Sequence, residues 1–114
     1  MDSRGRQVIW SMQARRQLGG AIEYISNDSL QNAQGVLRDV LDAASSLSTL
    51  SERGRVVPEV AHPAVRELFV RRYRLIDEVQ VAHVEILAFI HGSQDFGRWR
   101  GVPGDISESG PTTG

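Results

Sequence analysis

The stretch "RRYRLIDEVQVAHVEILAFIH", residues 71–91, decides the fold of this chain. With the preceding "VRELFV" it divides into three segments, 65–70, 72–79 and 82–90, that are rich in the β-branched, aromatic and other apolar residues of strands. The breaks between these segments are too short for a helical crossover, so neighbouring strands must run antiparallel. The sequence therefore predicts a three-stranded antiparallel sheet.

The last of these strands is apolar on both faces over its second half. Strict alternation assigns its side chains to two faces: Val84, Ile86, Ala88 and Ile90 on one, and His83, Glu85, Leu87, Phe89 and His91 on the other. Such a strand is typical of the interior of a sheet. We expect helices to cover one face and leave the other available to a partner.

A strand and two helices precede this sheet. "QVIWS" at 7–11 suits a first strand, and apolar residues at helical spacing predict an amphipathic helix over 12–26. "SNDS" breaks this helix, and either Asp28 or Ser29 can cap the next one.

The second helix has the strongest periodicity in the chain, with apolar residues recurring from Ala33 to Leu50. The short loop before it requires an antiparallel helical hairpin with one apolar seam. Gly35 is unfavourable in the helix interior unless a close contact requires glycine. Gly54 is the predicted stop, and Pro58 forbids continuation. The fold class is therefore α+β: an N-terminal strand, a helical hairpin and the three-stranded sheet.

Composition limits the chemistry that the chain can perform. Its 114 residues form one domain, and 40% hydrophobic with 24% charged residues is typical of a globular protein. The absence of cysteine excludes disulfides and thiolate chemistry. His62, His83 and His91 lack metal-ligand spacing, so we expect no metal and no cofactor. With no long apolar run and no signal sequence, the prediction is a cytoplasmic protein that does not enter membranes.

Charge alternates in blocks along the chain, and all thirteen cationic side chains are arginine. The net charge is +3 over residues 1–22, −4 over 23–52, +4 over 53–76 and −4 over 77–96, which with a neutral remainder gives the total of −1. Such blocks are typical of solvated faces. An arginine-rich surface also suits carboxylate or phosphate partners, because the guanidinium group binds both bidentately.

The composition changes after Phe96. "GRWRGVPGDISESGPTTG", residues 97–114, is rich in glycine and proline and has no apolar period. It predicts a flexible C-terminal tail behind a domain at residues 1–96. Trp99 is its one candidate anchor, either on the body of the protein or on a partner.

Several short motifs occur in the same order as the predicted elements. They are "VIWS" followed by "QARRQL", then "AIEYI", then "AASSLSTLSERGRVVPE", and finally "VRELFVRRYRLI" followed by "VEILAFIHG". In these motifs and their spacing, over residues 7–96, the chain resembles the ParE toxins of the RelE/ParE superfamily. These proteins are the toxin half of bacterial type II toxin–antitoxin modules.

The resemblance implies an α+β toxin held inactive by a ParD-like antitoxin, whose C-terminal part folds along the toxin. Several members of the family inhibit DNA gyrase by binding, without an evident catalytic centre. A hetero-oligomer with the antitoxin, gyrase as the target, and no sequence-specific DNA binding by the toxin alone are the corresponding expectations.

The RelE relatives implied by the same resemblance cut messenger RNA on the ribosome. Such cleavage needs an acid, a base and cations for the phosphorane. His91 is the candidate acid or base, and Arg72 with Arg74, two apart on a predicted strand, would share one face and hold phosphate. In "HGSQDF", however, Asp95 repels phosphate and Phe96 cannot transfer a proton. We therefore expect a non-catalytic inhibitor, with His91 as a structural hydrogen-bonding residue and the ribonuclease as the alternative.

Asp77 and Glu78 depart from the family pattern, which often has an aromatic and a basic residue there. One interpretation is a solvated turn paired with nearby arginines. The other is a changed contact with the antitoxin or the target.

Antitoxin binding follows from the arginine-rich surface, because an acidic antitoxin segment would place its carboxylates on it. The candidate contacts for antitoxin or target are Arg53, Arg55, Arg66, Arg71, Arg72, Arg74 and Trp99. A degenerate toxin that retains only antitoxin binding is a third hypothesis.

Overall fold

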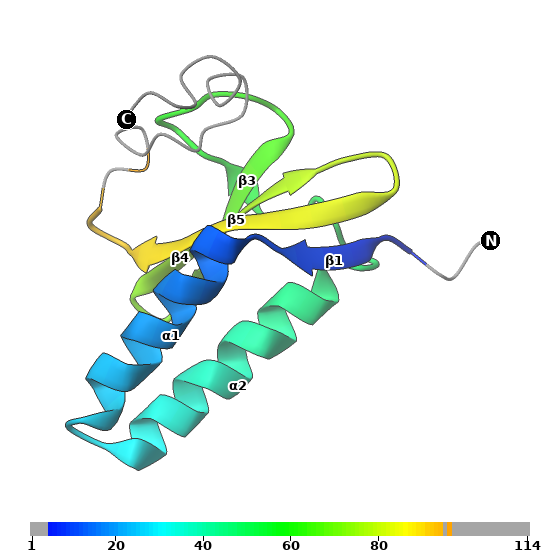
Figure 1. The fold of residues 1–114 in the computed structure, drawn as a ribbon. Coiled ribbons are helices and arrows are strands. Elements are labelled where there is room, and N and C mark those ends of the chain that lie inside the picture. The colour runs from blue at the N-terminus through cyan, green and yellow to red at the C-terminus, as the bar shows by residue number, and fades with distance from the viewer. Residues whose placement is uncertain (1–4, 95, 97–114) are drawn as a thin grey trace.

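The computed structural model describes residues 5–94 and 96 of the chain. Two helices pack on one side of a five-stranded sheet (Figure 1). The elements are β1 (Gln7–Trp10), α1 (Met12–Ser26), α2 (Leu30–Ser46), β2 (Arg55–Val56), β3 (Val65–Val70), β4 (Tyr73–Val79) and β5 (His83–His91). The predicted α+β class and element order are confirmed.

The sheet contains two strands more than the three predicted for it. The strand order is β1-β5-β4-β3-β2, with β1 parallel to β5 and every other pair antiparallel. The sequence predicted β1 but not its partner, because parallel pairing joins segments that are far apart along the chain. The short β2 has only two residues and no alternating pattern to reveal it.

Serine side chains begin both helices, and the one that begins α2 was among the predicted caps. The Oγ of Ser11 accepts a hydrogen bond from the backbone N–H of Ala14 at 3.0 Å, and the Oγ of Ser29 accepts one from Asn32 at 3.1 Å. Of the two candidate caps for α2, Ser29 is the one used. None of the helices in the described ranges is long and apolar enough to cross a membrane.

Gly54 is not the stop of the second helix, because α2 ends at Ser46 with Leu47 as its C-cap. The glycine instead allows its loop to lie against β3. A Cβ at Gly54 would lie 2.6 Å from the backbone oxygen of Glu67. Leu50, predicted to continue the apolar seam of the helix, lies beyond α2 and is exposed.

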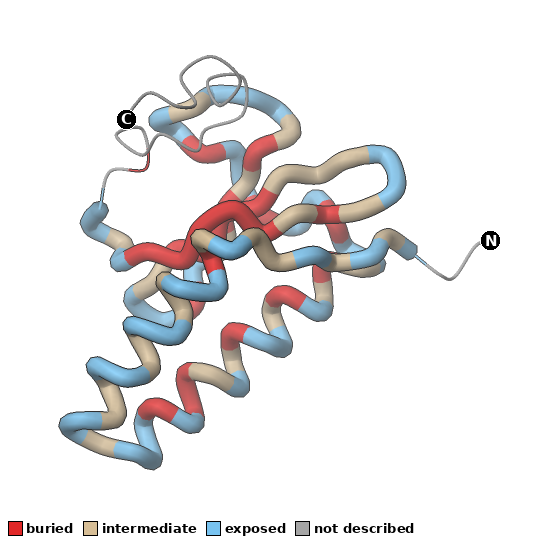
Figure 2. The backbone as a smooth tube through the Cα atoms, in the orientation of Figure 1, coloured by how far each residue is buried: buried red, intermediate tan, exposed pale blue. Residues whose placement is uncertain are grey.

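The buried apolar residues form one cluster on each face of the sheet. Figure 2 shows the buried positions concentrated in the central strands and recurring along α2. The helix-facing cluster comprises Ala14, Val36, Val40, Ala44, Leu47, Val70, Leu75, Val84, Ile86 and Phe89. The opposite cluster comprises Val57, Val65, Ile76, Leu87, Ala88, Ile90 and Phe96. The chain itself therefore covers part of the face that the sequence left available to a partner.

A β-bulge in β5 overturns the strict alternation predicted for that strand. Asp77 pairs with Ile86 whereas the preceding Ile76 pairs with Ala88, which leaves Leu87 as an extra residue. A bulge shifts the faces by one residue. Ile86 and Phe89 consequently lie on the same, helix-facing side of the sheet.

Candidate functional site

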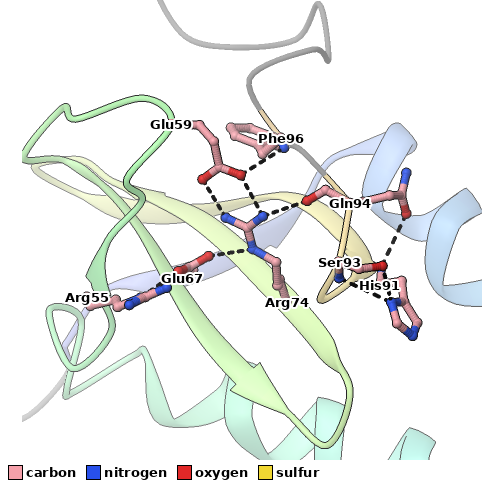
Figure 3. Close-up of polar contacts among 8 residues, drawn as sticks. All are labelled: Arg55, Glu59, Glu67, Arg74, His91, Ser93, Gln94 and Phe96. Atoms are coloured by element: carbon pink, nitrogen blue, oxygen red, sulfur yellow. Dashed lines mark hydrogen bonds and ion pairs between the residues drawn. The ribbon is translucent and has the colours of Figure 1, made fainter.

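Arg74 on β4 is buried among carboxylates on the face of the sheet opposite the helices (Figure 3). Its Nε donates to Glu67 Oε1 at 2.6 Å, while Nη1 and Nη2 donate to the two oxygens of Glu59 at 2.7 and 2.8 Å. Only 5% of the Arg74 side chain is exposed. The guanidinium group is therefore fully engaged with two acids of its own chain.

The contacts of Arg74 continue into its surroundings. Glu67 also accepts a hydrogen bond from Arg55 Nε at 2.6 Å. Arg74 Nη1 donates to the backbone oxygen of Gln94 at 2.7 Å, and the backbone N–H of Phe96 donates to Glu59 at 3.2 Å. This network joins β2, β3 and β4 to the loop that follows β2 and to the segment that follows β5.

The contact between Arg74 and Glu59 favours the charged form of both side chains. The hydrogen bond from Arg74 lowers the pKa of Glu59 to about 2, against the opposing effect of burial. The hydrogen bond to Glu59 likewise raises the pKa of Arg74 above its ordinary value. Both groups stay charged throughout the physiological range of pH.

The prediction that Arg72 and Arg74 share a strand face is wrong. β4 begins at Tyr73, so Arg72 belongs to the preceding turn, where its backbone oxygen accepts a hydrogen bond from Gly92 at 2.7 Å. Its side chain is exposed, whereas that of Arg74 is buried and neutralised. The two arginines do not form a phosphate clamp.

His91 ends β5 and is bound by its own loop. Its Nδ1 accepts a hydrogen bond from the backbone N–H of Ser93 at 3.2 Å and lies 2.9 Å from Ser93 Oγ (Figure 3). The ring also contacts the ring of Tyr73 edge-on, with centroids 5.8 Å apart. These contacts agree with the expected role as a structural hydrogen-bonding residue, because they hold the ring against its own loop and against Tyr73.

The other arginine candidates lie at more than one place in the fold. Arg53 donates to Ser46 Oγ at 2.9 Å, and Arg66 donates to the backbone oxygens of Pro63 and Gly54 at 3.1 and 3.0 Å. Both border the loop that follows α2. Trp99, together with the predicted tail at 97–114 and Asp95, lies outside the described residues.

Two further candidates make structural contacts. Arg55, besides its bond to Glu67, lies over the ring of Phe69 with 5.6 Å between Cζ and the ring centroid. Arg71, in the β3–β4 turn with a φ of 57°, pairs with Asp39 of α2 at 2.9 Å. A Cβ at Gly35 would lie 3.0 Å from Arg71 Nη2, so the glycine leaves room for the end of this arginine side chain beside α2.

Asp77 is not part of a solvated turn, because it lies inside β4 with none of its surface exposed. Neither of its carboxylate oxygens has a hydrogen-bond partner within the described part of the chain. Burial raises the pKa of Asp77 to about 7, although the charge of Arg66 acts in the opposite direction. Its neighbour Glu78 is half-buried and accepts a hydrogen bond from Gln80 at 3.2 Å.

An apolar groove along the helical hairpin was missed in the sequence. Its volume is about 620 Å³, and it is lined by Trp10, Arg15, Leu18, Gly19, Ile22, Glu23, Ser26, Leu37 and Leu41. Leu41 is 47% exposed there. The helical periodicity of the sequence contained the evidence for this groove. The sequence interpretation assigned the apolar positions of both helices to a single buried seam. The apolar stripes of the helices are in fact wider than the core needs.

Comparisons with known proteins identify a family and a similar fold. A family model described as "ParE toxin of type II toxin-antitoxin system, parDE" matches residues 8–96. A solved structure described as "Chromosomal ParDE TA system from P. aeruginosa" is similar in fold, with a TM-score of 0.63 and 18% identity over 78% of this chain and 98% of that chain. No curated protein matches the sequence significantly. The match over residues 8–96 shows that the chain belongs to the ParE toxin family of type II toxin–antitoxin systems.

Proposed function

We propose that this chain is a cytoplasmic toxin that acts by binding DNA gyrase and is held inactive by a ParD-like antitoxin. Family membership supports the toxin and its antitoxin, and gyrase is the target that the resemblance to ParE toxins implies. Action by binding is supported chiefly by Arg74. The cation that a nuclease site would need lies between Glu59 and Glu67 instead of facing a substrate.

The neighbouring groups strengthen this argument. A metal-free ribonuclease needs an acid, a base and cations around one phosphate. His91 Nδ1 is occupied by Ser93, and Arg72 lies in a turn while Arg74 is buried. The three residues lie near one another, but the guanidinium group of Arg74 is committed to Glu59 and Glu67 and does not face a substrate.

The groove between α1 and α2 is our candidate surface for the antitoxin. Its apolar lining suits the apolar face of a partner helix. Gly19 lines it, and a Cβ at that position would meet nothing within 4 Å in this chain. Glycine inside an exposed helix costs up to about 1 kcal/mol relative to alanine. A closely packed partner would explain the glycine at this position, whereas no contact within the isolated toxin does.

Induced expression of the chain without antitoxin tests the proposal. We expect growth arrest while messenger RNA stays intact. Arrest with cleaved messenger RNA would favour the ribonuclease, and normal growth at full expression would favour a degenerate toxin that retains only antitoxin binding. The His91→Ala variant is the matched control, because a binding toxin should still arrest growth with it.

A further inference from the structure

Two adjoining hollows lie at the end of the molecule where the chain enters β1. The first, of about 340 Å³, is lined by Arg6, Thr49, Leu50, Ser51, Glu52 and Arg53. The second, of about 380 Å³, shares Arg6 and Glu52 and adds the segments 62–64 and 79–81 together with Arg66. We call the two hollows together the arginine cleft. It is separate from the groove on the helices, which begins at Trp10 at the opposite end of β1.

Three arginines of the cleft are held in place by neutral oxygens. Arg6 Nε donates to the backbone oxygen of Gln80 at 2.7 Å. Arg66 donates to backbone oxygens and Arg53 to a serine hydroxyl, as described above. The ion pairs of the described residues involve Arg55, Arg71 and Arg74, but none of these three. Their charges are therefore positioned without being neutralised by contact.

The acids near the cleft do not balance this charge. Glu52 is the one carboxylate among the lining residues, against three guanidinium groups. Asp77 lies opposite Arg66 in the strand register but is fully buried, and burial raises the pKa of Asp77 to about 7. His62 uses its Nδ1 to accept a hydrogen bond from Ala64 at 3.1 Å. The cleft thus presents cationic donors to an incoming anion.

Apolar side chains at the same place indicate the kind of anion. Leu50 is 58% exposed and Val81 is 95% exposed, and both line the cleft. A nucleic-acid site would instead combine the arginines with aromatic platforms for bases, and the described lining residues include no phenylalanine, tyrosine or tryptophan. The net charge of −1 also gives no general attraction to a polyanion.

We propose that the arginine cleft binds an acidic peptide segment of a partner protein. Carboxylates of the peptide would accept hydrogen bonds from Arg6, Arg53 and Arg66, and its apolar side chains would cover Leu50 and Val81. Charged hydrogen bonds of this kind are roughly twice as strong as neutral ones, and a bidentate arginine adds directional specificity. The proposal depends on neither the identity of the toxin's target nor occupation of the groove on the helices.

Fluorescence anisotropy with the full chain tests this inference. The probe is a labelled short peptide of alternating glutamate and leucine, compared with a peptide in which every glutamate is replaced by glutamine and with a single-stranded oligothymidine. We expect the glutamate peptide to bind about tenfold more tightly than the glutamine peptide. Since this comparison changes only the ligand, it does not depend on whether a variant protein folds.

Protein variants then locate the site. Arg53→Gln and Arg6→Gln should each weaken binding of the glutamate peptide severalfold. Arg38→Gln, an exposed arginine of α2 outside the cleft, and Leu41→Glu, in the groove, should not. Equal binding of the two peptides, no binding of either, tighter binding of the oligonucleotide, or an equal loss with Arg38→Gln would each overturn the proposal.

Discussion

Glu59 binds Arg74 through both carboxylate oxygens, at 2.7 and 2.8 Å, although fifteen positions separate them in the sequence. This pair connects the loop that follows β2 to the middle of the sheet. Arg74, which the sequence suggested as part of a catalytic or recognition strand, therefore stabilises the fold.

Arg74→Leu should destabilise the protein by about 3–5 kcal/mol, because it leaves the buried Glu67 with Arg55 alone and removes both hydrogen bonds to Glu59. The urea midpoint of unfolding measures this loss. Arg72→Leu is the matched control in the neighbouring turn, where an exposed side chain should change stability by less than about 0.5 kcal/mol. Similar midpoints for the two variants would contradict the structural role of Arg74.

Glu59→Gln should remove a contribution to the free energy of unfolding that is lost at acid pH. The pKa of Glu59 is lowered from 4.5 to about 2 in the folded protein, so its contribution is fully present above about pH 4.5 and is lost as the pH falls towards 2. With partial exposure of the side chain, we expect about 2–3 kcal/mol. The free energies of unfolding of wild type and variant should therefore converge near pH 2. Glu52→Gln, an exposed acid, provides the control.

Asp77→Asn should remove a pH dependence of stability that has the opposite sign. Because burial raises the pKa of Asp77 from 3.8 to about 7, stability is fully present below about pH 3.8 and decreases as the pH rises towards 7. A shift of this size corresponds to about 4 kcal/mol at alkaline pH. Denaturation at about pH 4 and pH 8 should show that the variant loses less stability between them than wild type does. An unchanged difference would contradict the buried, unpartnered carboxyl.

The sequence predicted those features that depend on local patterns. The two helices follow from apolar spacing and the three antiparallel strands follow from short connections; these elements are confirmed, although α2 ends at Ser46, before its predicted stop. The parallel pairing of β1 with β5 and the extra residue Leu87 depend instead on contacts between distant segments. No local pattern specifies them.

The predicted site shows the same limit. Arg72 and Arg74 look equivalent in the sequence, yet one is exposed in a turn and the other is buried between Glu59 and Glu67. Glu67 and Glu59 belong to a strand and a loop whose approach to Arg74 cannot be deduced from spacing. Asp77 likewise looked like a polar turn residue, because its hydrophilicity suggested exposure that the fold does not provide.

Leu41→Glu should abolish neutralisation by the antitoxin encoded in the same module while leaving the toxin folded. Leu41 lines the groove and is already partly exposed, so a charge there disrupts an apolar interface more than it disrupts the core. Leu30→Glu is the matched control, since Leu30 is on the same helix, is 64% exposed and does not line the groove. Co-expression and pull-down with the antitoxin compare the two variants. Retained capture by Leu41→Glu would contradict the groove as the antitoxin surface.

A supercoiling assay with purified DNA gyrase tests the central claim most directly. We expect wild type to inhibit supercoiling, and the His91→Ala variant to inhibit it equally, because binding needs no acid or base at that position. The isolated antitoxin-bound complex should not inhibit. Full supercoiling activity in the presence of folded toxin that still arrests growth would contradict gyrase as the target.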